Sequence, residues 1–281
     1  MKSMGHHRAK SRGGLSWTMH YAALASGSKG NCHAFCDGER TLLLDAGLSL
    51  KQVRLRMEAV GLDPRTIRAV ALTHEHSDHI GAVAVLLRNT DWAFLATPET
   101  KAAVERIHGI QIPDHRWIPL RAGFAVDWCG WRVHPFTLPH DASDPVAYRL
   151  EVEGFNAAVV TDLGHPTALV ADHCQDLDLL VLEANHDVDM LREGGYPPLL
   201  KARILSRVGH LSNVSMADLL AKVLSPRLRT VVMAHLSEQN NDPELVRVVA
   251  AEVLRGWQTA LHLAHQRDPL RPGAHAPLVA S

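Results

Sequence analysis

Metal-binding side chains crowd into one short run of the chain, LTHEHSDHIG at residues 72–81. The ligand-type residues at matching spacing are His74, His76, Asp78 and His79. Imidazole suits zinc, iron and other borderline ions, and carboxylate also suits manganese. With three imidazoles and two carboxylates the run exceeds one closed tetrahedral site, so we expect two metal ions. The alternative is a histidine-rich loop that binds nothing.

Three further polar residues stand at the ends of apolar segments. His140 follows residues 133–139, Asp162 follows residues 157–161, and His235 follows residues 231–234. Each alone is more typical of a cap or a surface residue. Because catalytic groups gather where strands end and loops begin, their shared position favours one common site.

The elements that must position these residues follow from hydrophobic periodicity. Strands are predicted at 20–25, 32–36, 40–45, 68–73, 93–96, 124–128, 131–138, 145–152, 156–161, 178–182 and 229–234. Helices are predicted at 50–60, 79–88, 98–108, 166–173, 197–207, 212–224 and 242–255. Hairpin turns mixed with helical crossovers indicate mixed sheets covered by helices.

The composition is that of an ordinary globular protein, with 46% apolar and 21% charged residues among 281. The net charge of −1 shows no general basic excess, so any contact with nucleic acid must be local. The four cysteines form no C-x-x-C pair, which favours a reducing compartment and a cytoplasmic location.

The chain is predicted to form one domain over residues 19–265. Residues 1–18 are basic, rich in Gly and Ser, and lack the apolar segment of a secretory signal, so we expect a disordered extension. Residues 266–281 contain several Pro and Gly residues and are predicted to be a flexible tail. No window has the length of a membrane span, so no membrane association is expected.

These motifs occur in the order that is typical of the metallo-β-lactamase superfamily, over about residues 20–260. Asp45, after the apolar residues 42–44, is similar to that superfamily's first motif. The resemblance implies a four-layer αββα sandwich, in which two mixed β-sheets are flanked by helices, with the site at one sheet edge. It implies that one metal is held by His74, His76 and His140, and a second by Asp78, His79 and His235. Asp162 would bridge the two metals, and Asp45 would orient one of the ligands from behind.

Four segments resemble the YycJ/WalJ-type members: residues 26–32, 183–187, 209–213 and 234–241. These bacterial cytoplasmic proteins are regarded as metal-dependent exonucleases or phosphodiesterases, related to tRNase Z, RNase J and a cyclic phosphodiesterase of phosphonate metabolism. The resemblance implies two divalent ions, zinc or manganese with iron as a further option. It also implies attack by a metal-bridged hydroxide on nucleic acid, with DNA ends favoured, or on a small phosphodiester.

Glu183 and His210 resemble the pair with which tRNase Z protonates its leaving group. We therefore predict Asp78, Glu183 and His210 as catalytic residues, with His210 held cationic by Glu183. The alternatives are a helix cap at the end of a strand for Glu183 and an exposed histidine for His210.

The substrate contacts are less constrained. Ser28 and Asn31 could offer donors to a phosphate, or could belong to a tight turn between strands. His186 could line the pocket. Arg203 and Arg207 are spaced as neighbours on one helical face, which is either a basic rim for a nucleic-acid backbone or a solvated surface.

Two other functions stay open because fold alone does not choose among them. One is hydrolysis of a small ester, thioester, lactone or β-lactam, and the other is a non-catalytic metal-binding regulatory role. Only 72 residues separate Asp162 from His235, too few for a large inserted domain, which favours an exonuclease or small-diester enzyme over a tRNA processor. The sequence leaves monomer and homodimer open.

Overall fold

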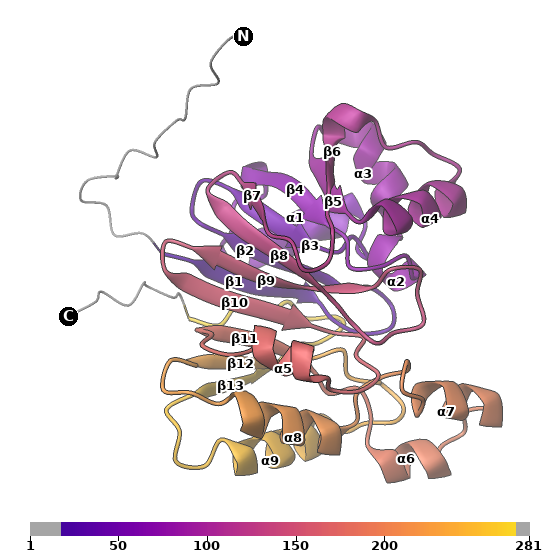
Figure 1. Cartoon of the computed structure of the whole chain (residues 1–281), viewed down its shortest axis with the longest axis vertical. Helices are drawn as coiled ribbons and strands as arrows, with labels where there is room; N and C mark the ends of the chain where they lie inside the picture. Colours follow the sequence, from indigo (N-terminus) through magenta and orange to yellow (C-terminus); the bar gives the residue numbers. More distant parts are fainter. Residues whose placement is uncertain (1–17, 274–281) are drawn as a thin grey trace.

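Two β-sheets face each other in the computed structural model, which describes residues 18–273 (Figure 1). The six-stranded sheet has the order β1-β2-β3-β4-β5-β6 and the seven-stranded sheet the order β13-β12-β11-β10-β9-β8-β7. The strands of the first sheet are β1 His20–Ala25, β2 Cys32–Cys36, β3 Thr41–Leu44, β4 Ile67–Ala71, β5 Ala93–Ala96 and β6 Trp117–Pro119. Those of the second are β7 Val126–Trp128, β8 Trp131–Thr137, β9 Val146–Val152, β10 Phe155–Val160, β11 Leu179–Glu183, β12 Thr230–Ala234 and β13 Ala260–Leu263.

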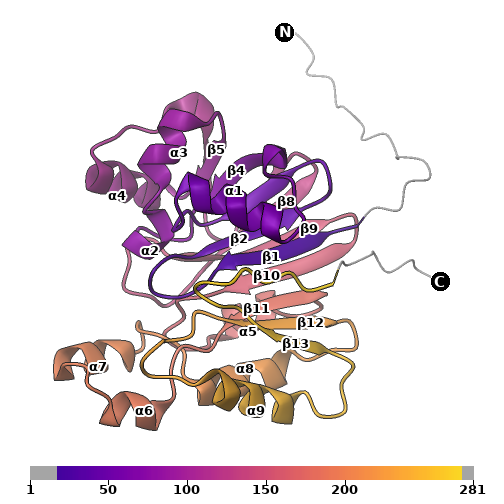
Figure 2. The same cartoon turned by 180° about the vertical axis from the view of Figure 1, so that it is seen from behind.

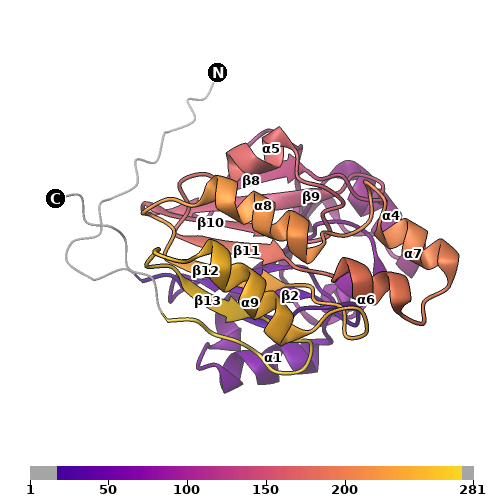
Figure 3. The same ribbon diagram turned by 90° about the horizontal axis from the view of Figure 1, so that it is seen from below.

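Helices cover the outer face of each sheet, which confirms the predicted four-layer αββα sandwich (Figures 1 and 2). The helices are α1 Leu50–Ala59, α2 Ser77–Ile80, α3 Val83–Asn89, α4 Pro98–His108, α5 Ala168–His173, α6 Val188–Glu193, α7 Pro198–Ile204, α8 Asn213–Val223 and α9 Pro243–Val253. Short 3₁₀ helices lie at Pro64–Thr66 and Asp114–Arg116. Figure 3 shows α5, α8 and α9 on the second sheet. In the described residues no helix has the length and apolar character needed to cross a membrane.

Both sheets are mixed, and their parallel parts aim at one edge. Strands β3 to β6 pair in parallel, as do β10 to β13, while β1–β2 and β7–β8–β9 pair antiparallel. The central parallel strands β3, β11 and β12 are buried along their whole length and have nearly continuous apolar sequences, as in LLVLE of β11. Since parallel strands end at the same edge, the residues that follow them meet there.

Three apolar clusters hold the layers together. One lies between the sheets and includes Phe35 and Leu44 of the first sheet with Tyr148 and Val181 of the second. The other two lie between each sheet and its helices. Burial of this apolar area is the dominant force that fixes the sandwich.

The structure differs from the sequence prediction at two helices. The helix predicted over 79–88 is two helices, α2 and α3, because the His79 carbonyl accepts a hydrogen bond from Ala46 N at 2.6 Å and Ala82 N donates to Ala46 O at 2.8 Å. The helix predicted over 197–207 ends at Ile204, whose carbonyl accepts a hydrogen bond from His210 N at 3.0 Å. In the first case a distant segment takes the bonds that would continue the helix, and in the second the loop that follows the helix folds back onto its last residue.

The C-terminal segment also differs. The tail predicted from residue 266 does not begin there, since Leu270 exchanges two backbone hydrogen bonds with Ala23 of β1, each 2.9 Å long. Gln266 Nε2 donates to Gly30 O at 2.9 Å. Strands β6 and β13 and helix α6 were not predicted. Residues 1–17 of the predicted extension and residues 274–281 of the predicted tail lie outside the described residues.

Candidate metal centre

The predicted ligands meet at the edge of the sandwich where the parallel strands end. His74 and His76 follow β4, Asp78 and His79 lie in α2, and His140, Asp162 and His235 follow β8, β10 and β12. Three residues within two positions of a strand end have left-handed backbones: Asp45, Asp162 and His235, with φ of 65°, 61° and 55°. Non-glycine residues rarely adopt this conformation, and such strain gathers at functional sites.

The first group of candidate ligands is His74, His76 and His140. His140 Nε2 lies 3.2 Å from His76 Nδ1. Two nitrogens bound to one tetrahedral zinc at about 2.0–2.1 Å would lie roughly 3.3 Å apart, so this spacing suits a shared ion. His74 Nε2 is buried and has no hydrogen-bond partner among the described residues. An orphaned buried nitrogen beside two other imidazoles fits a bound cation.

The second group is Asp78, His79 and His235. Asp78 Oδ2 lies 3.2 Å from His79 Nε2 and 3.6 Å from His235 Nε2. His235 Nε2 is also buried without a hydrogen-bond partner in the described chain. Asp162 lies between the two groups, with Oδ2 3.2 Å from His79 Nε2 and Oδ1 3.8 Å from His140 Nε2. Asp162 therefore lies within reach of both groups of candidate ligands.

The ring nitrogens that face away from the centre are held by the protein, which fixes the orientation and tautomer of each imidazole. Four Nδ1 atoms have such partners: His79 with Asp45 Oδ2 at 2.7 Å, His74 with Thr73 Oγ1 at 2.9 Å, His140 with Gly209 O at 3.1 Å and His235 with Glu183 Oε1 at 2.9 Å. With Nδ1 turned to these acceptors, each Nε2 faces the centre, where it would offer a lone pair to a bound metal ion. Asp45 thus has the orienting position that the resemblance implied.

Carboxylates surround the histidines of the centre and give it an excess of negative charge. Burial opposes protonation of His79, yet the carboxylates of Asp162, Asp45 and Asp78 raise its pKa well above the usual value. Burial likewise opposes protonation of His235, and Asp162, Asp78 and Glu183 raise its pKa in the same direction. The same carboxylates would attract divalent cations. The donor set, its spacing and its charge all fit two cations.

Glu183 lies behind the centre and joins two histidines. Its Oε1 accepts hydrogen bonds from His210 Nδ1 and His235 Nδ1, each 2.9 Å long, and its Oε2 accepts from Leu163 N and Leu211 N. Burial raises the pKa of Glu183, but His210 and His235 outweigh it and lower the value to about 2. The carboxylate therefore stays ionised, and it caps no helix.

The turn that carries Ser28 and Asn31 makes most of its hydrogen bonds within the protein. Asn31 is fully buried, and its Nδ2 donates to Asp78 Oδ2 at 3.0 Å, so it supports a candidate ligand and cannot reach a substrate. The amides of Gly27, Lys29 and Gly30 all donate to acceptors within the protein. Ser28 lines the cavity beside the centre, and its contact with a substrate stays a prediction.

The other predicted substrate residues have different fates. Arg203 lines the cavity, and its guanidinium bonds to both carboxylate oxygens of Asp141. Arg207 lies beyond the end of α7 and binds His165 Nε2 at 2.8 Å, so it shares no helical face with Arg203 and does not line the cavity. His186 is 1% exposed and lies outside the cavity lining, which contradicts its assignment to the pocket wall.

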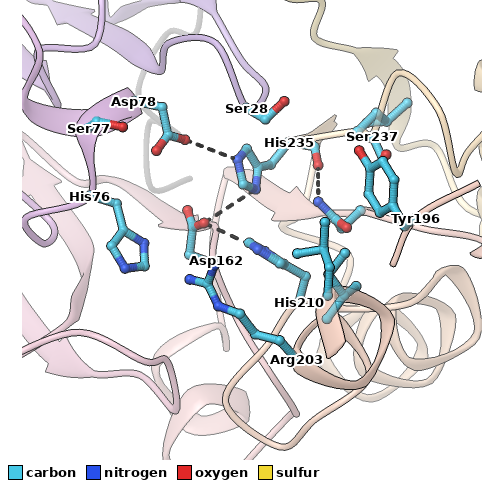
Figure 4. Close-up of a pocket in the computed structure, with 14 residues that line it drawn as sticks. Ser28, His76, Ser77, Asp78, Asp162, Tyr196, Arg203, His210, His235 and Ser237 are labelled. Atoms are coloured by element: carbon cyan, nitrogen blue, oxygen red, sulfur yellow. Dashed lines mark hydrogen bonds and ion pairs between the residues drawn. The ribbon is translucent and has the colours of Figure 1, made fainter. Parts of the chain in front are cut away.

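A cavity of about 340 Å³ opens beside the centre (Figure 4). Sequence reasoning missed several residues that line it: Asn185, Tyr196, Leu200, Ile204, Leu236 and Ser237. It also missed Thr73, whose hydroxyl and amide bind the Asp45 carboxylate. The only sequence signal for Thr73 was its place directly before the His-x-His pair. Tyr196 lies among Gly and Pro residues, where periodicity gives no signal.

Comparison with known proteins agrees with this geometry. A family model described as the Beta-lactamase superfamily domain matches residues 40–235, which include every candidate metal ligand. The chain belongs to this superfamily. "Exodeoxyribonuclease YycJ" of Bacillus anthracis is 35% identical over 258 residues, covering 90% of this chain and 97% of that protein. "Exodeoxyribonuclease WalJ" of Streptococcus pneumoniae is 34% identical over 235 residues, 83% of this chain and 87% of that protein.

The fold of this beta-lactamase superfamily member also matches solved structures. The metallo-beta-lactamase fold protein YhfI of Bacillus subtilis superimposes with a TM-score of 0.69 over 91% of this chain and all of that chain, at 14% identity. At so low an identity the likeness concerns the fold. The αββα architecture and the superfamily membership, both expected from the motifs, are confirmed.

Proposed function

We propose that this chain is a two-metal hydrolase that cleaves phosphodiester bonds in nucleic acid, acting as an exonuclease on DNA ends. The observation that carries the proposal is the buried Glu183 carboxylate that holds His210 at the cavity beside the candidate ligands. Hydrolysis of a natural diester expels a poor leaving group that gains from a proton. The relatives named exodeoxyribonucleases support the same reaction class.

Two divalent ions would occupy the centre in the arrangement that the ligand groups suggest. His74, His76 and His140 would hold one ion, and Asp78, His79 and His235 would hold the other, with Asp162 between them. When bound, such ions activate water as a nucleophile near neutral pH and polarise the phosphoryl group. The identity of the metal as zinc, manganese or iron, and the presence of exactly two ions, stay predictions.

The chain's own residues supply the remaining steps. Glu183 accepts from His210 Nδ1, which leaves Nε2 of the same ring free to give a proton to the departing oxygen. The carboxylate beside the ring stabilises the imidazolium that this step needs. Arg203, at the cavity wall, offers a planar guanidinium to a phosphate of the substrate, although it shares that guanidinium with Asp141.

The decisive experiment is a substrate panel with the purified chain loaded with Mn²⁺ or Zn²⁺. It should include bis-nitrophenyl phosphate, DNA and RNA labelled at one end, a thioester and a β-lactam. We expect turnover of the phosphodiesters, loss of turnover after chelation, and stepwise loss of end nucleotides from DNA. Absence of phosphodiester turnover with either metal would sink the proposal.

The panel also tests the other functions. Turnover of the thioester or β-lactam alone would establish the small-substrate hydrolase, and metal binding without any turnover would favour a regulatory protein. Asp162→Asn is a useful comparison, because it should lower both the bound metal and the activity. The cytoplasmic location and the choice between monomer and homodimer stay predictions that size-exclusion and fractionation experiments can check.

A further inference from the structure

The cavity beside the metal centre has two walls of different chemistry. His76, Asp78 and Asp162 form a polar wall, and Tyr196, Leu200 and Ile204 contribute apolar surface. Figure 4 shows Tyr196 across the cavity from His76 and Asp78. Among the 14 described residues that line this cavity, Tyr196 alone has a benzene ring. The metal centre accounts for the polar wall and leaves the apolar one without a role.

The segment that carries Tyr196 is held firmly. Gly194 N donates to Met190 O at 2.8 Å, and a Cβ at Gly194 would lie 2.6 Å from Asn240 Oδ1, so the loop packs closely there. Lys201 Nζ donates to Arg192 O at 2.6 Å and ties α7 back to α6. Two prolines follow the tyrosine and restrict the backbone further. These contacts restrain the backbone on both sides of Tyr196 and so place its Cα beside the cavity.

The ring itself is available to a ligand. Tyr196 is partly exposed, and its hydroxyl makes no hydrogen bond to any residue that the structure describes. A buried structural tyrosine usually finds a partner for its hydroxyl. An aromatic face without such an anchor, beside a phosphodiester-cleaving centre, suits contact with a flat apolar group.

We propose that Tyr196 is a stacking platform for the nucleobase of the terminal nucleotide, which rests on the function proposed above. A nucleotide has both parts that the cavity can take: an anionic phosphate for the polar wall and a flat base for the apolar wall. Every base has a π face, so stacking serves any sequence, as an exonuclease requires.

The test compares single-stranded oligonucleotides whose terminal nucleotide either carries its base or is abasic, with the modification placed at one end or the other. Base–aromatic stacking accounts for roughly a 5- to 150-fold effect. At one of the two ends, the wild-type chain should therefore have a kcat/KM that is higher by that factor for the base-bearing oligonucleotide than for the abasic one. Tyr196→Phe should keep this ratio, and Tyr196→Ala should reduce it to near one.

Leu199→Ala is the matched control, because Leu199 lies three residues after Tyr196 in the first turn of α7, is 86% exposed and does not line the cavity. It should leave the ratio unchanged. A wild-type chain that cleaves base-bearing and abasic ends equally, or a Tyr196→Ala variant that keeps the preference, overturns the platform while the phosphodiesterase stands. A wild-type chain that cleaves neither oligonucleotide overturns the proposed function, and the platform falls with it.

Discussion

Removal of the His210 imidazole should separate leaving-group protonation from the rest of catalysis. The ring binds Glu183 through Nδ1 and lies at the cavity with its other nitrogen free. In His210→Ala, Glu183 loses one donor but keeps three: His235 Nδ1, Leu163 N and Leu211 N. The substitution should therefore leave the fold and the candidate ligands in place.

The expected size of the effect depends on the leaving group. General acid catalysis contributes about 10²- to 10⁴-fold, which corresponds to roughly 3–5 kcal/mol of transition-state stabilisation. A natural diester expels an alkoxide and should lose this whole factor in His210→Ala. A nitrophenyl diester expels a stabilised anion that needs no proton, so its turnover should fall by less than about tenfold on the same argument.

The assay measures kcat for a DNA oligonucleotide and for bis-nitrophenyl phosphate with equally metal-loaded wild-type and variant proteins. His165→Ala is the matched control, because that histidine binds Arg207 and does not line the cavity. It should leave both rates close to those of the wild type. Metal content should be measured for each protein, so that loss of an ion is not mistaken for loss of an acid.

The acid role is refuted if His210→Ala slows both substrates by the same factor at full metal content. Equal losses would mean that His210 positions the centre through Glu183 and His235 and gives no proton. Glu183→Gln adds a second check, since it removes the charge that stabilises the imidazolium of His210. Its effect should also be larger on DNA than on the nitrophenyl diester.

Three further outcomes follow from the packing and the buried groups. A Cβ at Gly47 would overlap Asp78 O and Asn31 N, so Gly47→Ala should reduce the metal content of the purified protein. Gly273→Ala is the control, because Gly273 has open space around it and its substitution should leave the metal content unchanged. Equal metal content in the two variants would contradict the packing argument. The pKa of His33 is lowered to about 3 in the folded protein, mainly by burial. Below pH 6.5 the unfolded chain therefore binds more protons at His33 than the folded chain does, and the free energy of unfolding decreases as the pH is lowered. This loss is about 2 kcal/mol between pH 7 and pH 5 and should be smaller in His33→Gln, as measured by urea unfolding; parallel pH profiles would contradict it. Cys129 is the one exposed cysteine of four, so a thiol reagent should modify one thiol per native chain and all four after unfolding; faster reaction of the others would show that the sheets open.

The strands and the metal motif could be predicted because their signals are local. The apolar run before His74 and those before Asp162 and His235 mark buried parallel strands, and the polar residue after each run marks the functional edge. The superfamily pattern then placed these residues in one site, and the distances between them are consistent with it.

The substrate side of the site could not be predicted in the same way, because it depends on contacts between distant segments. The direction of Asn31 is set by Asp78, 47 residues away along the chain. Arg207 leaves the helical face of Arg203 because the chain turns back to bond His210 N to Ile204 O. Tyr196 belongs to a loop whose place is set by Asn240 and Met190. Periodicity has no access to such contacts.

The tripeptide Asp45-Ala46-Gly47 shows how a few non-local contacts build the centre. The Asp45 carboxylate accepts from His79 Nδ1 and from Thr73, so it orients one candidate ligand and secures the segment that leads to another. Ala46 pairs with the backbone of His79 and Ala82, which ends α2 just after the two ligands that the helix carries. Gly47 has no side chain, and this allows the loop to press against the backbone of Asp78. A longer helix 79–88 would leave the His79 carbonyl bonded within the helix and unavailable to Ala46 N. The break in the predicted helix is therefore a condition for the metal geometry, because the same loop that interrupts the helix holds His79 and Asp78 in position.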